Sequence, residues 1–154
     1  MNIYIDADAL PVIAKELIIK TANRTQTMAV FVANRMTKLP PSPFLSYVVV
    51  GAGFDVADDY IVNYIQAGDL VITSDIPLAN DVLEKGAKVL TARGEEFSKD
   101  NIKPRLNVRD FMESLRGTGV LDPKSMGGQK PYSNKDKIAF AGGLNRLVKP
   151  QNLS

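Results

Sequence analysis

The most informative feature of this 154-residue sequence is what it lacks, since it contains no cysteine and no histidine. Without cysteine there are no disulfide bonds, thiol nucleophiles or zinc–thiolate sites. Without histidine there is no Ser-His-Asp or Cys-His catalysis, no paired-histidine cleavage and no imidazole ligation of metals. Any catalysis must use carboxylates, hydroxyls, Lys or Arg, or a hard metal ion with oxygen ligands, such as Mg²⁺ or Mn²⁺.

Two further absences concern location. The sequence has no run approaching the roughly 18 apolar residues of a membrane span. It also lacks the basic segment followed by an apolar stretch that marks a signal peptide. We therefore expect a cytoplasmic protein that does not contact a membrane. Its 45% hydrophobic and 23% charged residues predict one globular domain over residues 1–154.

Charge is distributed unevenly along the chain. Residues 1–99 contain 9 Lys/Arg against 12 Asp/Glu, whereas residues 100–154 contain 10 against 5. An acidic body with a basic C-terminal third is compatible with a cation site beside a polyanion contact, and equally with an ordinary solvated surface. We divide the domain into an α/β core, 1–99, and a basic helical extension, 100–154, with a flexible Gly/Pro/Lys-containing loop near 118–132.

Short apolar segments alternate with segments of helical periodicity. Strands are expected at 2–5, 27–34, 44–50, 69–74 and 87–92, and helices at 8–25, 55–68, 76–86, 102–117 and 133–148. The first helix is expected to pack Val12, Ile13, Leu17 and Ile18 on one face, and the last opens with a capping-box-like Ser133 and Asp136. Nearly continuous apolar strands in this alternation predict an α/β fold whose mainly parallel five-stranded sheet has helices on both faces.

Acidic residues follow two of these strands. Asp6 and Asp8 come after the first strand and Asp75 after the fourth. Ligands of open parallel sheets bind at the carboxyl ends of the strands, so Asp6 and Asp75 are predicted to meet if strands one and four are neighbours. Asp8 occupies the position expected for the N-cap of the first helix. These three aspartates are the candidate catalytic residues.

Helix 55–68 supplies further carboxylates. Asp58 shares a face with Ile61 and Ile65 and is expected to point towards the sheet, with Asp55 and Asp59 on the neighbouring stripe. Two carboxylates about 4 Å apart repel by roughly 4 kcal/mol at an effective dielectric of ~20. A converging cluster therefore needs protons or a cation, for which Mg²⁺ or Mn²⁺ is the simplest choice. The candidate metal ligands are Asp6, Asp55, Asp58, Asp59 and Asp75. Taken singly, each also fits an ordinary helix cap or first-turn charge.

A site of this kind supports attack on a phosphate. The cation would polarise a phosphoryl oxygen, and a carboxylate would orient or deprotonate the attacking water. Four residues are candidates for binding the substrate: Ser74 beside Asp75, Arg93 after the fifth strand, and Arg105 and Arg109 one turn apart on the basic helix.

Five stretches carry a resemblance: "IDADALP", "GFDVADDYI", "GDLVITSDIPLANDVLEKGAKVL", "RLNVRDFM" and the late "GG…S.KDK.AFA". They make the sequence similar to the YaiI/YqxD family of bacterial proteins of unknown function, over almost the whole chain. That family in turn resembles the PIN-like and NYN nuclease domains. The resemblance implies a three-layer Rossmann-like fold in which acidic residues gather around Mg²⁺ or Mn²⁺ and cleave RNA.

The resemblance also implies roles for particular residues. Asp6 and Asp75 match the aspartates that end strands one and four of PIN-like domains. Asp59 is similar to their helix aspartate, with Asp58 as the alternative one residue away, and Asp55 resembles an NYN aspartate. The glutamate of an earlier PIN helix has no counterpart here.

Our interpretation is a metal-dependent nuclease that acts on RNA. The sequence leaves open whether the substrate is instead DNA, a nucleotide or another phosphate ester, and whether the protein forms a homo-oligomer. One alternative is a non-catalytic RNA-binding or assembly module of the same fold. The other follows from "DAD", which also resembles the opening of haloacid-dehalogenase phosphatases. There Asp6 would be the nucleophile and Asp8 the acid–base residue, although Leu10 departs from that pattern.

Overall fold

A six-stranded, mainly parallel sheet forms the centre of the structure, a computed structural model that describes residues 1–53, 56–106 and 131–150. Its strands are β1 (Ile3–Asp6), β2 (Ala29–Ala33), β3 (Leu45–Val49), β4 (Leu70–Ile72), β5 (Lys88–Leu90) and β6 (Glu96–Phe97). Their order across the sheet is β3-β2-β1-β4-β5-β6. The first five strands are parallel, and β6 pairs antiparallel with β5.

All five predicted strands are confirmed, but the predicted strand number is wrong because β6 adds a sixth. This strand has only two residues, too few to show a periodicity in the sequence. It forms because the chain reverses at Gly94, whose φ of +89° suits glycine, and returns along β5.

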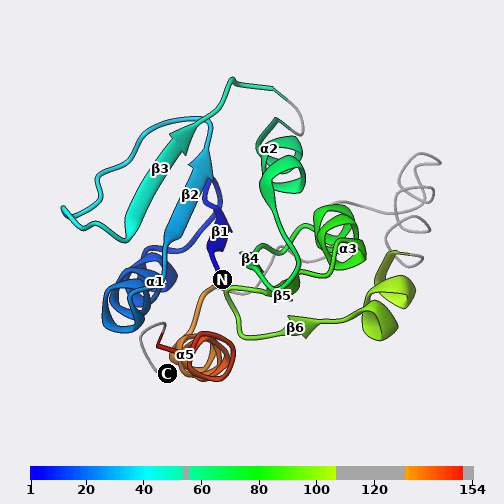
Figure 1. Ribbon diagram of the computed structural model, residues 1–154. Helices are drawn as coiled ribbons and strands as arrows, with labels where there is room; N and C mark the ends of the chain where they lie inside the picture. The colour runs from blue at the N-terminus through cyan, green and yellow to red at the C-terminus, as the bar shows by residue number, and fades with distance from the viewer. Residues whose placement is uncertain (54–55, 107–130, 151–154) are drawn as a thin grey trace.

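Helices cover the sheet on both faces, as predicted. They are α1 (Val12–Thr25), α2 (Val56–Tyr64), α3 (Ile76–Glu84) and α5 (Asn134–Leu147), and residues 99–106 are also helical. Figure 1 shows α1 and α5 together on one face of the sheet and α2 and α3 on the other. In the part of the chain that the structure describes, no helix is long and apolar enough to cross a membrane.

The two faces of the sheet build two separate apolar clusters, because side chains alternate along a strand. In β1, Ile3 and Ile5 point towards α1 and α5, whereas Tyr4 points towards α2 and α3. In β4, Leu70 and Ile72 lie in the first cluster and Val71 in the second. Strands buried on both faces explain the continuous apolar runs in the sequence.

The start of α1 differs from the prediction. The helix begins at Val12, with Pro11 in an extended conformation at the N-cap and no side-chain cap, so the predicted N-cap role of Asp8 is wrong. Val12 and Ile13 are exposed, at 71% and 41%. The buried face instead centres on Ala14, Ile18 and Ala22, which are spaced four residues apart and so lie on one side of the helix.

Helix α5 is fixed to the end of β5. Its predicted capping box is confirmed, since Ser133 and Asp136 each bond the other's backbone N–H. The Tyr132 hydroxyl donates to the carbonyl oxygen of Ala92 over 2.6 Å. A Cβ at Gly94 would lie 2.5 Å from Ala139 of α5, so only glycine permits this approach. Of the predicted helix 102–117 and loop 118–132, residues 107–130 lie outside the described residues.

Candidate active site

The sheet order meets the condition on which the predicted site depended. Strands β1 and β4 are hydrogen-bonded neighbours, with Ile5 opposite Ile72. Asp6 and the segment 73–75 therefore lie beside each other at the carboxyl edge of the sheet. The chain order of the strands reverses at this pair, and open α/β sheets bind ligands outside the carboxyl ends of strands at such a reversal.

The Thr73 hydroxyl connects the two strand ends. It donates to Oδ2 of Asp6 over 3.1 Å and accepts the backbone N–H of Asp75 over 3.0 Å. Asp75 caps α3, since its Oδ1 accepts the N–H of Leu78 over 3.0 Å. Both carboxylates are thus held in one orientation by neighbouring donors.

Asp8 bonds to the end of β2, on the side of β1 away from β4 and Thr73. Its two oxygens accept the backbone N–H of Asn34 over 3.0 and 3.3 Å. Asn34 follows the end of β2, so the carboxylate continues the β1–β2 ladder by one hydrogen bond. This hydrogen bond to the end of β2 fixes the position of Asp8.

Four carboxylates face one pocket of ≈ 310 Å³ at this edge. Asp6, Asp8, Asp58 and Asp75 line it, together with Asn34, Val50, Gly51, Gly53, Val56 and Ala57. Asp58 is half-buried on α2, as its shared face with Ile61 predicted. Asp59 is exposed and does not line the pocket, and Asp55 lies outside the described residues.

The electrostatics of the pocket favour a positive partner for Asp6. Burial raises the pKa of Asp6, and the negative charges of Asp75 and Asp8 raise it further. The hydrogen bond from Thr73 acts in the opposite direction and lowers that pKa. The ionised carboxylate is therefore costly in the folded protein unless a proton or a cation accompanies it.

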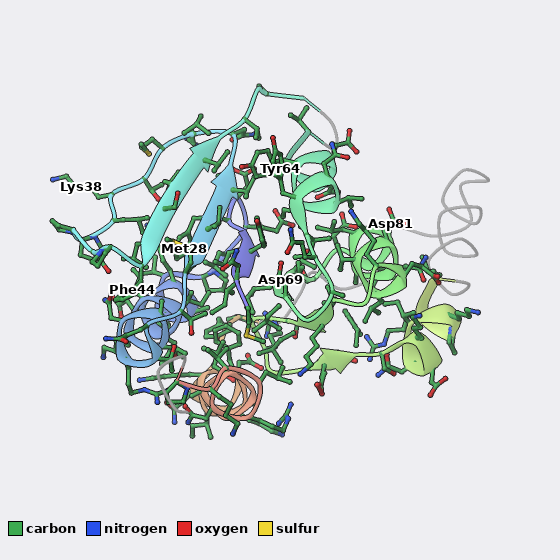
Figure 2. The ribbon with its side chains drawn as sticks, viewed as in Figure 1. Met28, Lys38, Phe44, Tyr64, Asp69 and Asp81 are labelled. Atoms are coloured by element: carbon green, nitrogen blue, oxygen red, sulfur yellow. The ribbon has the colours of Figure 1, made fainter. Side chains whose placement is uncertain are left out.

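Not every acidic residue belongs to this pocket. Asp69 is 7% exposed, and its oxygens accept the N–H groups of Asn2 and Gln66 over 2.9 and 3.0 Å. Figure 2 shows it beside the start of β1, at the end of the sheet opposite the pocket. Asp69 thus joins the start of β1 to the turn before β4 and has a structural role.

The carboxylates of the pocket are possible ligands for a metal ion. No group of three or more Asp or Glu side chains in residues 1–53, 56–106 and 131–150 is arranged to hold one metal ion. Mg²⁺ usually keeps several waters and takes only one or two carboxylates plus substrate phosphates. The donors of the pocket are all oxygen atoms, with the Asp6 carboxylate held by the Thr73 hydroxyl and the Asp75 carboxylate by the Leu78 N–H, and they suit a hydrated cation of that kind.

Three of the four predicted substrate-binding residues line a second pocket next to the first. Ser74, Arg93 and Arg105 line a pocket of ≈ 330 Å³ whose wall includes Phe97 and Tyr132. A small pocket of ≈ 40 Å³, lined by Asp6, Thr73 and Ser74 among others, lies between the two. Arg109 lies outside the described residues.

Comparison with known proteins places the chain in a family. A family model described as "Uncharacterized BCR, YaiI/YqxD family" matches residues 4–150. The chain belongs to the YaiI/YqxD family. The resemblance read from the five sequence stretches is thereby confirmed.

Curated relatives of this YaiI/YqxD chain cover nearly its whole length. A UPF0178 protein from Psychrobacter cryohalolentis is 64% identical over 149 residues, which are 97% of this chain and 100% of that protein. UPF0178 proteins from Shewanella baltica and Colwellia psychrerythraea are 51% and 49% identical, each across 96% of this chain and 95% of theirs. No solved structure matches the chain.

Sequence reasoning missed three residues of this YaiI/YqxD site. Thr73 was identifiable in principle, because a hydroxyl directly after a strand and two residues before an N-cap aspartate is placed to bond both. Asn34 contributes a backbone N–H, which carries no side-chain signal. Tyr132 reaches the second pocket from a segment 40 residues after Ala92, a distance along the chain that no local pattern spans.

Proposed function

We propose that this YaiI/YqxD protein is a metal-dependent nuclease that hydrolyses phosphodiester bonds in RNA with Mg²⁺ or Mn²⁺. One observation carries the proposal: Asp6, Asp8, Asp58 and Asp75 line a single pocket where the strand order reverses. They come from three separate elements, so the pocket is a product of the fold. The resemblance to PIN-like and NYN domains supports the same reaction class.

The cation would be held by Asp6 and Asp75, with Asp8 and Asp58 adding negative charge around it. When bound, it supplies polarisation of a phosphoryl oxygen and neutralises charge on the leaving oxygen. The positive charge of the cation would offset the cost of burying the ionised Asp6 carboxylate. Burial is the main cause of the raised pKa of Asp6, and the negative charges of Asp75 and Asp8, which add to it, would also attract the cation.

The protein's own residues would position the reacting groups. Thr73 and the N-terminus of α3 fix the Asp6 and Asp75 carboxylates, so little reorganisation is needed when substrate binds. Asp8 or Asp58 would accept a proton from water as its oxygen bonds to phosphorus. The phosphorus–ribose oxygen bond then breaks, and the proton passes to the leaving oxygen.

A cleavage assay tests this function. Labelled single-stranded and structured RNAs are incubated with Mn²⁺, with Mg²⁺ and with chelator. We expect cleavage only with a divalent cation, and a loss of at least about a hundredfold in Asp6→Asn and Asp75→Asn. Asp59→Asn is the matched control, because Asp59 is an exposed acid beside Asp58 that does not line the pocket.

Failure of the assay has distinct forms. Cleavage of no RNA by the wild type, or cleavage that both substitutions leave intact, contradicts the proposal. Salt-sensitive RNA binding without cleavage that persists in Asp6→Asn would point instead to a non-catalytic RNA-binding module. Formation of an aspartyl-phosphate at Asp6, detected by the binding of its analogue beryllofluoride, would point to a phosphatase.

A further inference from the structure

The second pocket contains two arginines whose guanidinium groups are held in place. Arg93 forms an ion pair with Asp136 over 2.8 Å, and its guanidinium carbon lies 5.8 Å from the centre of the Tyr132 ring. Arg105 forms an ion pair with Glu95, and its guanidinium carbon lies 5.3 Å from the centre of the Phe97 ring. Each guanidinium thus has an aromatic ring against it and an acid beside it.

The groups lining this pocket suit a phosphate. Among the residues that the structure describes, its charged lining residues are Arg93, Arg105 and Glu95, two cations to one acid, in contrast to the four aspartates of the neighbouring pocket. Guanidinium N–H groups and the Ser74 hydroxyl are donors that match phosphate oxygens. A phosphate that entered would either bind the two guanidinium groups together with Asp136 and Glu95 or replace these acids as their partner.

The two pockets are parts of one surface. The small pocket between them shares Asp6 with the aspartate pocket and Ser74 with the arginine pocket. Ala9, Pro11 and Ala92 line both the small pocket and the arginine pocket. An RNA strand that passes over Asp6 can therefore continue into the pocket that Arg93 and Arg105 line.

We propose that the arginine pocket is a phosphate subsite that holds the phosphate next to the cleaved one in an RNA strand. The inference rests on the proposed function, since it assumes that the scissile phosphate sits in the aspartate pocket. The Tyr132 and Phe97 rings already have guanidinium groups against them, so these rings are not available to stack on a base. The subsite therefore recognises the phosphate and not the base. Either a terminal phosphate or an internal phosphodiester supplies that chemistry.

Binding of a short oligoribonucleotide tests the subsite without any cleavage. The probe is a 3′-fluorescein-labelled RNA hexamer, with a 5′-phosphate or a 5′-hydroxyl, measured by fluorescence anisotropy at low ionic strength in chelator. Because no divalent cation is present, a protein that cleaves nothing still gives a result. Failure of the nuclease proposal and failure of the subsite are therefore distinguishable.

Three variants separate phosphate binding from a structural role. Arg105→Gln should weaken binding by about tenfold or more, the usual effect of losing a hydrogen bond to a charged group. Glu95→Gln should tighten binding by about two- to fivefold, because it removes the acid that competes for Arg105. A misfolded protein would not bind more tightly. Arg146→Gln is the matched control, since Arg146 pairs with Glu96 over 3.6 Å but does not line the pocket.

Each result supports or overturns the subsite. If the 5′-phosphorylated hexamer binds more tightly than the 5′-hydroxyl hexamer and the difference is lost in Arg105→Gln, the pocket binds a terminal phosphate. If the two hexamers bind equally and Arg105→Gln weakens both, the pocket binds an internal phosphodiester. Binding that Arg105→Gln and Glu95→Gln leave unchanged, or that Arg146→Gln weakens equally, overturns the proposal.

Discussion

The Thr73 hydroxyl gives the sharpest quantitative test of the pocket. Thr73 is 4% exposed, and its hydroxyl both donates to Asp6 and accepts from the N–H of Asp75. Thr73→Val keeps the shape of the side chain and removes both bonds. A hydrogen bond to a charged group contributes about 1.5–3 kcal/mol and a neutral one about 0.5–1.5 kcal/mol. We expect the free energy of unfolding at pH 7 to fall by about 2–4 kcal/mol.

The same substitution should move a titration. The Thr73 hydrogen bond lowers the pKa of Asp6, so its loss should raise that pKa further above the ordinary value. Urea unfolding followed by circular dichroism measures the stability, and carbon-detected NMR of the Asp6 carboxyl group measures the titration. The stability and the pKa report on the same bond independently.

A matched variant separates the charged bond from a neutral one. Thr91 is 7% exposed, and its hydroxyl accepts one backbone N–H, from Glu95, over 3.1 Å. Thr91→Val should therefore cost only about 1 kcal/mol. A Thr73→Val loss no larger than that of Thr91→Val, or an Asp6 pKa that stays or falls, would refute the reasoning.

Three further predictions concern the pocket and the docking of α5. The pKa of Asp6 is raised in the folded protein, so the folded state binds the proton more tightly, and the free energy of unfolding falls as the pH rises from the pKa of the unfolded chain to that of the folded protein. Asp6→Asn should therefore be more stable than the wild type at pH 7 and lose this part of the pH dependence, measured by urea unfolding at a series of pH values. Mn²⁺ should raise the melting temperature of the wild type through binding linkage but leave that of Asp6→Asn unchanged; equal shifts would place the cation elsewhere. Gly94→Ala should lower the free energy of unfolding by about 2–4 kcal/mol, because φ is +89° and the new Cβ would lie 2.5 Å from Ala139. Gly142→Ala in α5 is the matched control: no atom lies within 4 Å of its new Cβ, so it should raise the free energy of unfolding by about 0.5–1 kcal/mol.

Local sequence patterns predicted most of the elements, because the strands are buried on both faces and the helices have helical periodicity, but the start of α1 was placed four residues too early. The placement of Asp6 and Asp75 also followed from the sequence, since residues after parallel strands reach one edge. Which strands are neighbours did not follow, because the sheet order depends on how whole faces pack. That order decided whether these carboxylates meet.

Hydrogen-bond and ion-pair partners far apart along the chain could not be predicted from local patterns. Asp8 was assigned to a helix cap by a local rule, yet its partner is the N–H of Asn34, 26 residues away. Arg93 was placed correctly at the edge, but its partner Asp136 lies 43 residues further along the chain. The sequence left the choice between Asp58 and Asp59 open, although the face that Asp58 shares with Ile61 was a local signal; in the structure Asp58 lines the pocket and Asp59 does not.

The most direct test of the nuclease site compares two adjacent residues on α2. Single-turnover cleavage of a 5′-labelled single-stranded RNA with Mn²⁺ is measured for Asp58→Asn and for Asp59→Asn, which carry the same change in charge. Asp58 lines the pocket and Asp59 does not. We predict that Asp58→Asn cleaves at least about tenfold more slowly than the wild type and that Asp59→Asn cleaves at the wild-type rate. Equal rates for the two variants, or no cleavage by the wild type, would contradict the account.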